Sequence, residues 1–290
     1  MTFHMINVAN SVRRIFSDDK LIEGELLNRM GFQVIRTFVA HLTYSLRTVA
    51  PAQRDIAAKI DELKREGLVI WPDFLPSDHF EGVLAEFQRV SDSSRREFKV
   101  LQQGRNRLER FDIERMGESE LPNIYRYFSD SRILRIIEAA EKQPLNKYYK
   151  LREMEILWQG PTTEPEDVQS DLHSDIFFHT HRAWLYLTDV NMESGPLAVV
   201  KRTHHLNMRQ LYYIYRESVR PGPDGSRRIT KREIEKLPFK ETIVTCRRNT
   251  LILANTCAYH RRLPGQPGHE RHSLHTNWRA NPFPAILRLG

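Results

Sequence analysis

The chain has 290 residues, of which 40% are hydrophobic and 10% aromatic, and its 44 Lys and Arg against 37 Asp and Glu give a formal net charge of +7. This aromatic content and an ordinary charged fraction of 28% exclude a disordered or fibrous protein. The length fits two domains, or one large β-type domain with additions. Cys246 and Cys257 form at most one disulfide, so a reducing compartment is expected.

The N-terminal twenty residues lack the charged, apolar and small-residue regions of a signal peptide. No run of about 18 uncharged apolar residues occurs that would span a membrane. We therefore expect a cytoplasmic protein.

Residues 26–54 contain four arginines and no acidic residue, and their apolar residues recur at helical spacing. This pattern predicts an amphipathic helix ended by Pro51. The polar stripe holds Arg29, Gln33, Arg36, Ala40, Thr43 and Arg47, and the apolar remainder holds Phe32, Ile35, Phe38, Val39, Leu42, Leu46 and Val49. Two interpretations stand: the helix packs on the core, or it lies on the inner face of an anionic membrane, apolar side down and arginines at the headgroups.

The next hundred residues predict helices around one short strand. A helix over 56–67 is closed by Gly67, a strand covers 68–75, and a helix follows Ser77. Residues 91–120 are highly charged and are expected to form surface helix or loop, followed by a helix over 133–142.

From Met154 onward, short β-type runs are separated by Gly, Pro, Asn and Asp, which predicts an all-β barrel or sandwich. An insertion at 201–240 interrupts these runs with a helical piece and a turn-rich tip at 221–225. The predicted domains are thus a basic amphipathic segment, 1–54, and a β-rich domain, 55–290, that carries the insertion.

The strongest chemical signal is His173-Ser174-Asp175 before a β-rich run, with His260 after a later apolar strand. Residues i and i+2 of an extended segment point to the same side, so His173 and Asp175 can bind the same metal ion. Two imidazoles and one carboxylate form a facial triad that suits non-haem Fe(II) with open coordination positions.

The stretch 171–205 contains this HxD motif, Leu187-Thr188-Asp189-Val190 and Ser194-Gly195-Pro196-Leu197, and it resembles the phytanoyl-CoA dioxygenase family of Fe(II)/2-oxoglutarate oxygenases. The N-terminal part 63–87 is also similar to the opening element of that family. The resemblance covers about 55–90 and 150–280. It implies an α+β fold with a mainly β core, namely a double-stranded β-helix (a jelly-roll or cupin-like barrel) buttressed by N-terminal helices.

The resemblance further implies that His173, Asp175 and His260 ligate iron, and that Arg271 binds the distal carboxylate of the cosubstrate 2-oxoglutarate. A guanidinium presents the fork of donors that such a carboxylate accepts. Ser273, two residues along the same predicted strand, adds a hydrogen bond to this set. With O2, such a site hydroxylates an aliphatic C–H and releases succinate and CO2.

Two features depart from the family pattern. Arg202-Thr203-His204 replaces the usual Gly-Ser-His, which leaves the role of His204 open. Other histidines crowd the ligand segments, and we interpret them as surface or supporting groups, including His181, which also neighbours Asp175. They are His179, His181, His205, His269, His272 and His275. The presence of Asp175 favours hydroxylation over halogenation.

The basic excess is local, because 201–240 holds eleven Lys and Arg against four acidic residues, a net charge of +7. A connection between barrel strands usually borders the active-site mouth, so an anionic substrate is expected, and a solvated basic face is the alternative. With the basic helix, this favours a glycolipid on an anionic membrane, with the Kdo sugar of lipopolysaccharide as the specific hypothesis.

Other classes remain open at this stage. Tyr212, Tyr213 and Tyr215 among arginines suit a nucleic-acid-modifying oxygenase, which we rank below the lipid hypothesis because it gives the basic helix no purpose. A small-molecule or natural-product hydroxylase and a non-catalytic ligand-binding barrel are further alternatives. The sequence sets no oligomeric state.

Overall fold

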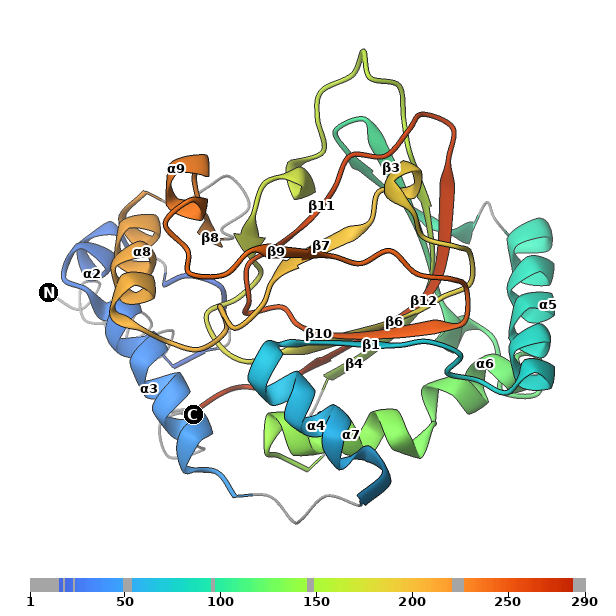
Figure 1. The fold of residues 1–290 in the computed structure, drawn as a ribbon, viewed down its shortest axis with the longest axis horizontal. Helices are drawn as coiled ribbons and strands as arrows, with labels where there is room; N and C mark the ends of the chain where they lie inside the picture. Colours follow the sequence, from blue (N-terminus) through green and yellow to red (C-terminus); the bar gives the residue numbers. More distant parts are fainter. Residues whose placement is uncertain are drawn as a thin grey trace, which may run out of the picture.

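The computed structural model describes residues 16–17, 19–22, 24–48, 54–94, 97–144, 149–220 and 227–283. Two antiparallel sheets face each other in this part of the chain, and helices cover the outer side of the larger sheet (Figure 1). This is the α+β jelly-roll architecture that the sequence predicts, with a mainly β core and N-terminal helices as its buttress.

Each sheet is formed by strands that are distant in the chain. In spatial order, the larger sheet contains β1 (Leu68–Trp71), β10 (Thr250–Asn255), β6 (His181–Tyr186), β12 (Glu270–Arg279), β4 (Tyr149–Trp158), β3 (Asn106–Asp112) and β2 (Lys99–Gln103). The smaller sheet contains β8 (Arg227–Arg228), β5 (His173–Ser174), β11 (His260–Arg262), β7 (Leu197–Val200) and β9 (Glu241–Ile243).

The helices divide into two groups by position. The group on the larger sheet contains α4 (Arg54–Glu66), α5 (Ser77–Ser94), α6 (Pro122–Phe128) and α7 (Ser131–Glu141). The group at the other side of the barrel contains α2 (Glu25–Arg29), α3 (Phe32–Leu46), α8 (Met208–Val219) and α9 (Lys231–Ile234). Short 3-10 turns are η2 (Ile113–Arg115), η4 (Val168–Ser170) and η5 (Met192–Ser194).

Strand β10 explains how one sheet serves two cores. All six of its residues are buried, because the helices cover one side and the smaller sheet covers the other. Leu251 and Leu253 join the core under the helices, whereas Ile252 and Ala254 pack toward the smaller sheet. A strand buried on both faces needs no polar alternation, as the apolar run in this segment indicates.

The prediction of surface helix or loop over 91–120 is wrong for much of that segment. Strands β2 and β3 form a hairpin there, turned at Gly104 with φ of 59°, and β3 pairs with β4. Leu108 and Phe111 lie on opposite faces of β3, one toward the cavity and one toward the core under the helices, and the charged residues around them obscured the strand in the sequence. Consequently, Leu108 and Arg110 reach the interior of the barrel.

The prediction of one helix over 26–54 is wrong in its extent. Gly31 adopts φ of 83° and separates α2 from α3, and α3 ends at Leu46, well before Pro51. The inward face of α3 is the polar stripe, since Gln33, Arg36 and Thr37 are buried. Ile35, Phe38, Leu42 and Leu46 are exposed, the reverse of an ordinary core-packed helix, whereas Ala40 and Val39 pack against the cluster around Phe177. Arg36 is fully buried and does not reach the surface.

The insertion 201–240 contributes directly to the barrel. Its helix α8 packs against α2 and α3, and its strand β8 pairs with β5, so that His173 lies opposite Arg228. The turn-rich tip at 221–225 lies outside the described residues. Among the residues with described structure, no helix is long and apolar enough to span a bilayer.

We predict that Leu253→Ala destabilises the fold, because Leu253 is fully buried between β10 and the helices. The expected loss in the free energy of unfolding is about 2–5 kcal/mol. Chemical denaturation measures it. The control Ile243→Ala truncates an apolar residue that is 44% exposed on β9, and a change within about 0.5 kcal/mol is expected there. Equal losses in the two variants would contradict this account of the core.

Candidate active site

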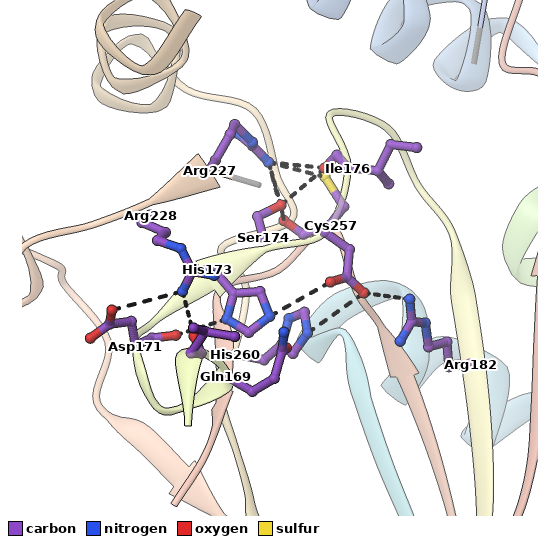
Figure 2. A network of polar contacts seen from close by, with 12 residues as sticks. Gln169, Asp171, His173, Ser174, Ile176, Arg182, Arg227, Arg228, Cys257 and His260 are labelled. Carbon is purple, nitrogen blue, oxygen red and sulfur yellow. Dashed lines mark hydrogen bonds and ion pairs between the residues drawn. The ribbon is translucent and has the colours of Figure 1, made fainter. Parts of the chain in front are cut away.

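The three predicted iron ligands converge at one end of the smaller sheet (Figure 2). His173 on β5 lies directly opposite His260 on β11 in the antiparallel register, and Asp175 follows β5. Asp175 Oδ1 is 3.6 Å from His173 Nε2, and its Oδ2 is 3.7 Å from His260 Nε2. One ligand atom from each residue lies within 4.8 Å of the others, a spacing at which a metal ion can bind all three.

Backbone carbonyls orient both imidazoles. His173 Nδ1 is 2.7 Å from the carbonyl oxygen of Asp171, and His260 Nδ1 is 2.9 Å from that of Ala258. A carbonyl only accepts, so each Nδ1 carries the hydrogen and each Nε2 keeps a lone pair directed at Asp175. In the described part of the chain, the buried Nε2 of His173 has no hydrogen-bond partner. This orphaned acceptor beside a carboxylate fits a bound cation.

The charges of the triad also suit a metal. Burial, and next the neighbouring His260, lower the pKa of His173 to about 4. Burial alone would raise the pKa of Asp175, yet Arg182, which lies 2.8 Å away, and then His260 and His173 hold it well below its usual range. At neutral pH, His173 is therefore neutral and Asp175 ionised, the protonation states in which these side chains bind metals.

The insertion holds the ligand-bearing loops together. Arg227 on β8 is buried, and its guanidinium donates to Ser174 Oγ at 2.6 Å and to the carbonyl of Ile176 at 3.2 Å. Ser174 Oγ also lies 2.9 Å from the carbonyl of Cys257 (Figure 2). These contacts join the segment around Asp175 to the segment before His260. Nothing in the sequence links Arg227 to the HxD motif, because the two are far apart along the chain.

His173 and His260 line a cavity of about 80 Å³ between the sheets. Five arginines and one carboxylate line it, together with aromatic and apolar side chains. These residues are Leu108, Arg110, Glu155, Gln169, His173, Arg182, Trp184, Tyr186, Leu197, His260, Arg261, Arg262 and Arg271. The cavity is therefore suited to small anions.

Arg271 lies on β12 in the same cavity as the two histidines. It is buried, its Nη1 donates to the carbonyl of Gly195, and its guanidinium carbon is 5.3 Å from the centre of the Tyr186 ring. Ser273 is buried two residues along β12, paired opposite Tyr186 and Glu155. It lies outside the residues that line the cavity, so the structure brings Arg271 to the cavity but not Ser273.

A second cluster of potential ligands lies on the inner face of the larger sheet, where His275 Nδ1 is 3.3 Å from both Glu153 Oε2 and Glu155 Oε1. Arg110 already neutralises these carboxylates, at 2.9 Å from Glu155 and 3.4 Å from Glu153. Burial alone would raise the pKa of Glu155, but His275 and then Arg110 lower it to about 2. The guanidinium supplies the positive charge here, so of the two clusters the His173 cluster is the better fit to a metal ion.

The other histidines in the described residues have structural partners, as His181 and His204 illustrate. His181 Nδ1 is 2.6 Å from Glu141 Oε1, so it does not compete with His173 for Asp175. His204 Nε2 is 2.9 Å from the carbonyl of Lys64, and its ring fills the space above Gly67, where a Cβ would lie 2.6 Å from its Nδ1. The role that the sequence left open for His204 is therefore to fix the turn between α4 and β1.

Sequence reasoning missed several residues of the cavity. Arg110 lay in the segment assigned to surface helix or loop, and Arg182 and Trp184 lay on a strand whose inward face the sequence does not identify. Arg262 is the last residue of β11, and its Nη1 lies 2.6 Å from Asp167 Oδ2. Its position two residues after His260, on the same side of an extended strand, was the available signal.

A facial triad inside a jelly-roll barrel, with a buried arginine in the same cavity, defines a non-haem Fe(II)/2-oxoglutarate-dependent oxygenase. Residues 63–238, more than half of the chain, match the model of the phytanoyl-CoA dioxygenase (PhyH) family. The chain belongs to this family, and it is an Fe(II)/2-oxoglutarate-dependent dioxygenase. The predicted family, enzyme class and use of iron and 2-oxoglutarate are thereby confirmed.

Solved structures support the fold. The epimerase SnoN, in complex with Fe3+, alpha ketoglutarate and nogalamycin RO, is 16% identical, with a TM-score of 0.55 over 80% of this chain and 89% of its own. The carbocyclase SnoK from nogalamycin biosynthesis is 12% identical, with a TM-score of 0.50 over 79% and 84%. A search of the curated proteins found no match.

We predict that Arg227→Met weakens metal binding, because Ser174 and the carbonyls of Ile176 and Cys257 lose their shared donor. Loss of a group that supports metal ligands typically costs between about ten- and one-hundredfold in affinity. Calorimetric titration with Co(II), a redox-stable substitute for Fe(II), measures the change. The control Arg232→Met removes the same charge from an exposed position of the insertion and should retain wild-type affinity. A parallel loss in both variants would show that only the net charge matters.

Proposed function

We propose that this dioxygenase hydroxylates an aliphatic C–H bond of an anionic, lipid-linked sugar, with the Kdo sugar of lipopolysaccharide as the best candidate. In this proposal, His173, Asp175 and His260 hold Fe(II), and Arg271 binds the distal carboxylate of 2-oxoglutarate. The observation that carries it is the arginine-lined cavity beside the triad.

The triad residues have defined tasks. His173 and His260 offer neutral Nε2 atoms whose direction is fixed by the carbonyls of Asp171 and Ala258. Asp175 supplies the negative charge, and Arg182 keeps that carboxylate ionised and positioned. When bound, iron would activate O2 as the oxidant: one oxygen atom would enter the C–H bond to give an alcohol, and the other would enter 2-oxoglutarate, which would lose CO2 and become succinate.

Arg271 is suited to the far end of the cosubstrate because its guanidinium is buried at the side of the cavity. Tyr186 lies under it, and the carbonyl of Gly195 holds one of its nitrogens, so the fork has a fixed direction. A carboxylate that accepts from a fixed fork is bound with specific geometry. The hydrogen bond from Ser273 to the cosubstrate remains a proposed addition, since Ser273 is buried and lies outside the residues that line the cavity.

The rest of the cavity favours an acidic sugar. Arg110, Arg261 and Arg262 line it in addition to Arg271, and each is held by a carboxylate partner, so their donors are arranged in advance. The carboxylate and hydroxyl groups of a sugar acid can accept from such donors. The aromatic rings of Trp184 and Tyr186 provide flat apolar surface for a sugar ring.

The nucleic-acid alternative has less support. Tyr213, one of the three tyrosines that could stack on bases, is buried in the core beneath α8. Arg216, next in the same helix, is paired with Glu217 and Glu233. One of the three tyrosines and one arginine of this helix are therefore engaged within the protein and not offered to a nucleic-acid strand.

We predict that the purified protein, supplied with Fe(II), 2-oxoglutarate and O2, adds one oxygen atom to a Kdo-bearing lipid and releases succinate in equal amount. Mass spectrometry of the lipid and a succinate assay measure both. Asp175→Ala should abolish both signals, because it removes the anionic ligand. The control Asp171→Ala keeps the carbonyl that orients His173 and should remain active. Full activity of Asp175→Ala would refute the triad assignment, and succinate release without lipid oxidation would refute the substrate.

Arg271→Met should raise the KM for 2-oxoglutarate by between about ten- and one-hundredfold, the cost of losing a charge-assisted pair of hydrogen bonds. Steady-state succinate release as a function of 2-oxoglutarate concentration provides the value. Arg261→Met removes another cavity arginine, whose partner is Glu241, and should leave this KM near that of the wild type. Similar increases in the two variants would indicate that only the positive charge of the cavity is needed.

A further inference from the structure

The surface formed by α2, α3 and α8 is unusually apolar. Large hydrophobic side chains point outward from these helices and from the residue between α2 and α3, and we call this set the docking face. It consists of Leu26, Met30, Ile35, Phe38, Leu42, Leu46, Met208, Tyr212 and Tyr215. Phe38 is 53% exposed and Leu46 is 74% exposed. Exposed apolar residues gathered in this way mark an interaction site rather than ordinary surface.

The apolar residues of α3 are exposed because its polar side is occupied. Arg36 is fully buried, and its Nη2 donates to the carbonyls of Ser17 at 2.7 Å and Asp19 at 2.6 Å. The side-chain oxygen Oε1 of Gln33 accepts from the backbone N–H of Ile22 at 3.2 Å. Turning the helix to bury Phe38 and Leu42 would leave Arg36 and Gln33 without these partners outside the helix. The outward orientation of the apolar stripe is therefore fixed by the fold.

The three helices present this surface together. Helix α8 packs against α2 and α3 on the same side of the barrel (Figure 1). The Tyr215 hydroxyl donates to the carbonyl of Arg29 at 3.1 Å. Met208, Tyr212 and Tyr215 recur at helical spacing along the exposed side of α8. Tyrosine is favoured where an apolar body meets a polar headgroup layer.

The charge around the docking face has one dominant sign. Residues 25–48 and 208–220 hold six arginines against two glutamates. Arg36 is fully buried, so five of these arginines lie toward the surface, and two of the five, Arg29 and Arg216, pair with carboxylates. Within α3 itself, the outward stripe carries no charge. An apolar stripe with arginines at its margins is complementary to anionic lipid, whose headgroups attract the arginines while the acyl boundary accepts the apolar side chains. A soluble partner protein would not require this excess of positive charge.

We propose that the docking face binds the headgroup region of a membrane leaflet that contains anionic lipid. This inference deepens the proposed function and rests on it for its purpose, because it names the surface from which a lipid-linked substrate is taken. The apolar side of α3 makes the contact, as in the membrane interpretation of the sequence, but Arg36 of the polar stripe is buried in the protein and takes no part.

The docking face also lies close to the active site. On the inward side of α3, the Arg36 guanidinium carbon is 4.2 Å from the centre of the Phe177 ring, and His41 Nε2 is 3.0 Å from the carbonyl oxygen of Phe177. Phe177 follows Asp175 by two residues. One helix, about 10 Å across, therefore separates the bound leaflet from the loop that carries an iron ligand. This position suits an enzyme whose substrate headgroup projects from the leaflet.

The test is sedimentation of the full chain with vesicles of phosphatidylcholine, with and without phosphatidylglycerol. The wild type should bind the anionic vesicles and release at high salt, because screening weakens attraction between exposed charges. The double variant Phe38→Glu with Leu42→Glu should lose at least about tenfold in vesicle affinity, since two apolar anchors are removed. Failure of the wild type to bind anionic vesicles would overturn the proposal.

The matched control is Val100→Glu with Ile243→Glu. These residues are 55% and 44% exposed on β2 and β9, so the control adds the same charge at similar exposure away from the docking face. It should bind vesicles nearly as well as the wild type. Equal loss in both double variants would reduce the effect to net charge and overturn the proposal. The proposal would also be overturned if the wild type fails to bind vesicles and is a dimer by light scattering, and if only the Phe38 and Leu42 variant is a monomer. The docking face would then bind a second copy of the chain.

Both double variants should keep wild-type affinity for Co(II) and succinate release on a soluble Kdo fragment, because neither touches the cavity. This readout separates the two proposals. Activity that survives in Asp175→Ala counts against the proposed function and leaves vesicle binding unaffected. Vesicle binding that survives in the Phe38 and Leu42 variant counts against the docking face and leaves the catalytic assignment unaffected.

Discussion

The antiparallel pairing of β5 with β11 is the interaction on which the site depends, because it sets His173 opposite His260. Two short strands do not hold such a register by themselves, and the structure supports them from both sides. Strand β7 pairs with β11, while β8 pairs with β5 and inserts Arg227 behind Ser174. These contacts offset the unfavourable free energy of bringing two buried imidazoles and a partly buried carboxylate together. The ligands are therefore arranged before a metal binds.

The larger sheet carries the complementary task. One of its faces packs on helices through residues such as Leu253 and Leu274, and the other presents charged and aromatic residues to the cavity. Placing Arg110 and Glu155 inside a barrel is tolerable because each charge has a partner within hydrogen-bonding distance. The same arrangement gives the cavity its fixed donors. Under the proposed function, one set of ion pairs stabilises the barrel and recognises the substrate.

The N-terminal helices show how a sequence pattern can have two physical meanings. An amphipathic pattern indicates that one side of a helix is apolar, and in most proteins that side packs against the core. Here Arg36, Gln33 and the carbonyls near Asp19 satisfy one another on the inward side, which leaves Phe38 and Leu42 outside. Contact with Phe177 connects this arrangement to the active-site loop.

The sequence by itself determined the chemistry: the HxD motif, His260 and Arg271 at the spacing that the family resemblance implies, and the β-rich texture that predicts a barrel or sandwich. The HxD pair and the buried strands follow from local order along the chain, since i and i+2 share a side of a strand and apolar runs identify buried strands. Only the tertiary structure decided which side of α3 is exposed, that Arg227 supports the ligand loops, and that Arg110 reaches the cavity. Each of these depends on contacts between segments far apart in the sequence, where partners for buried polar groups, rather than local periodicity, fix the orientation.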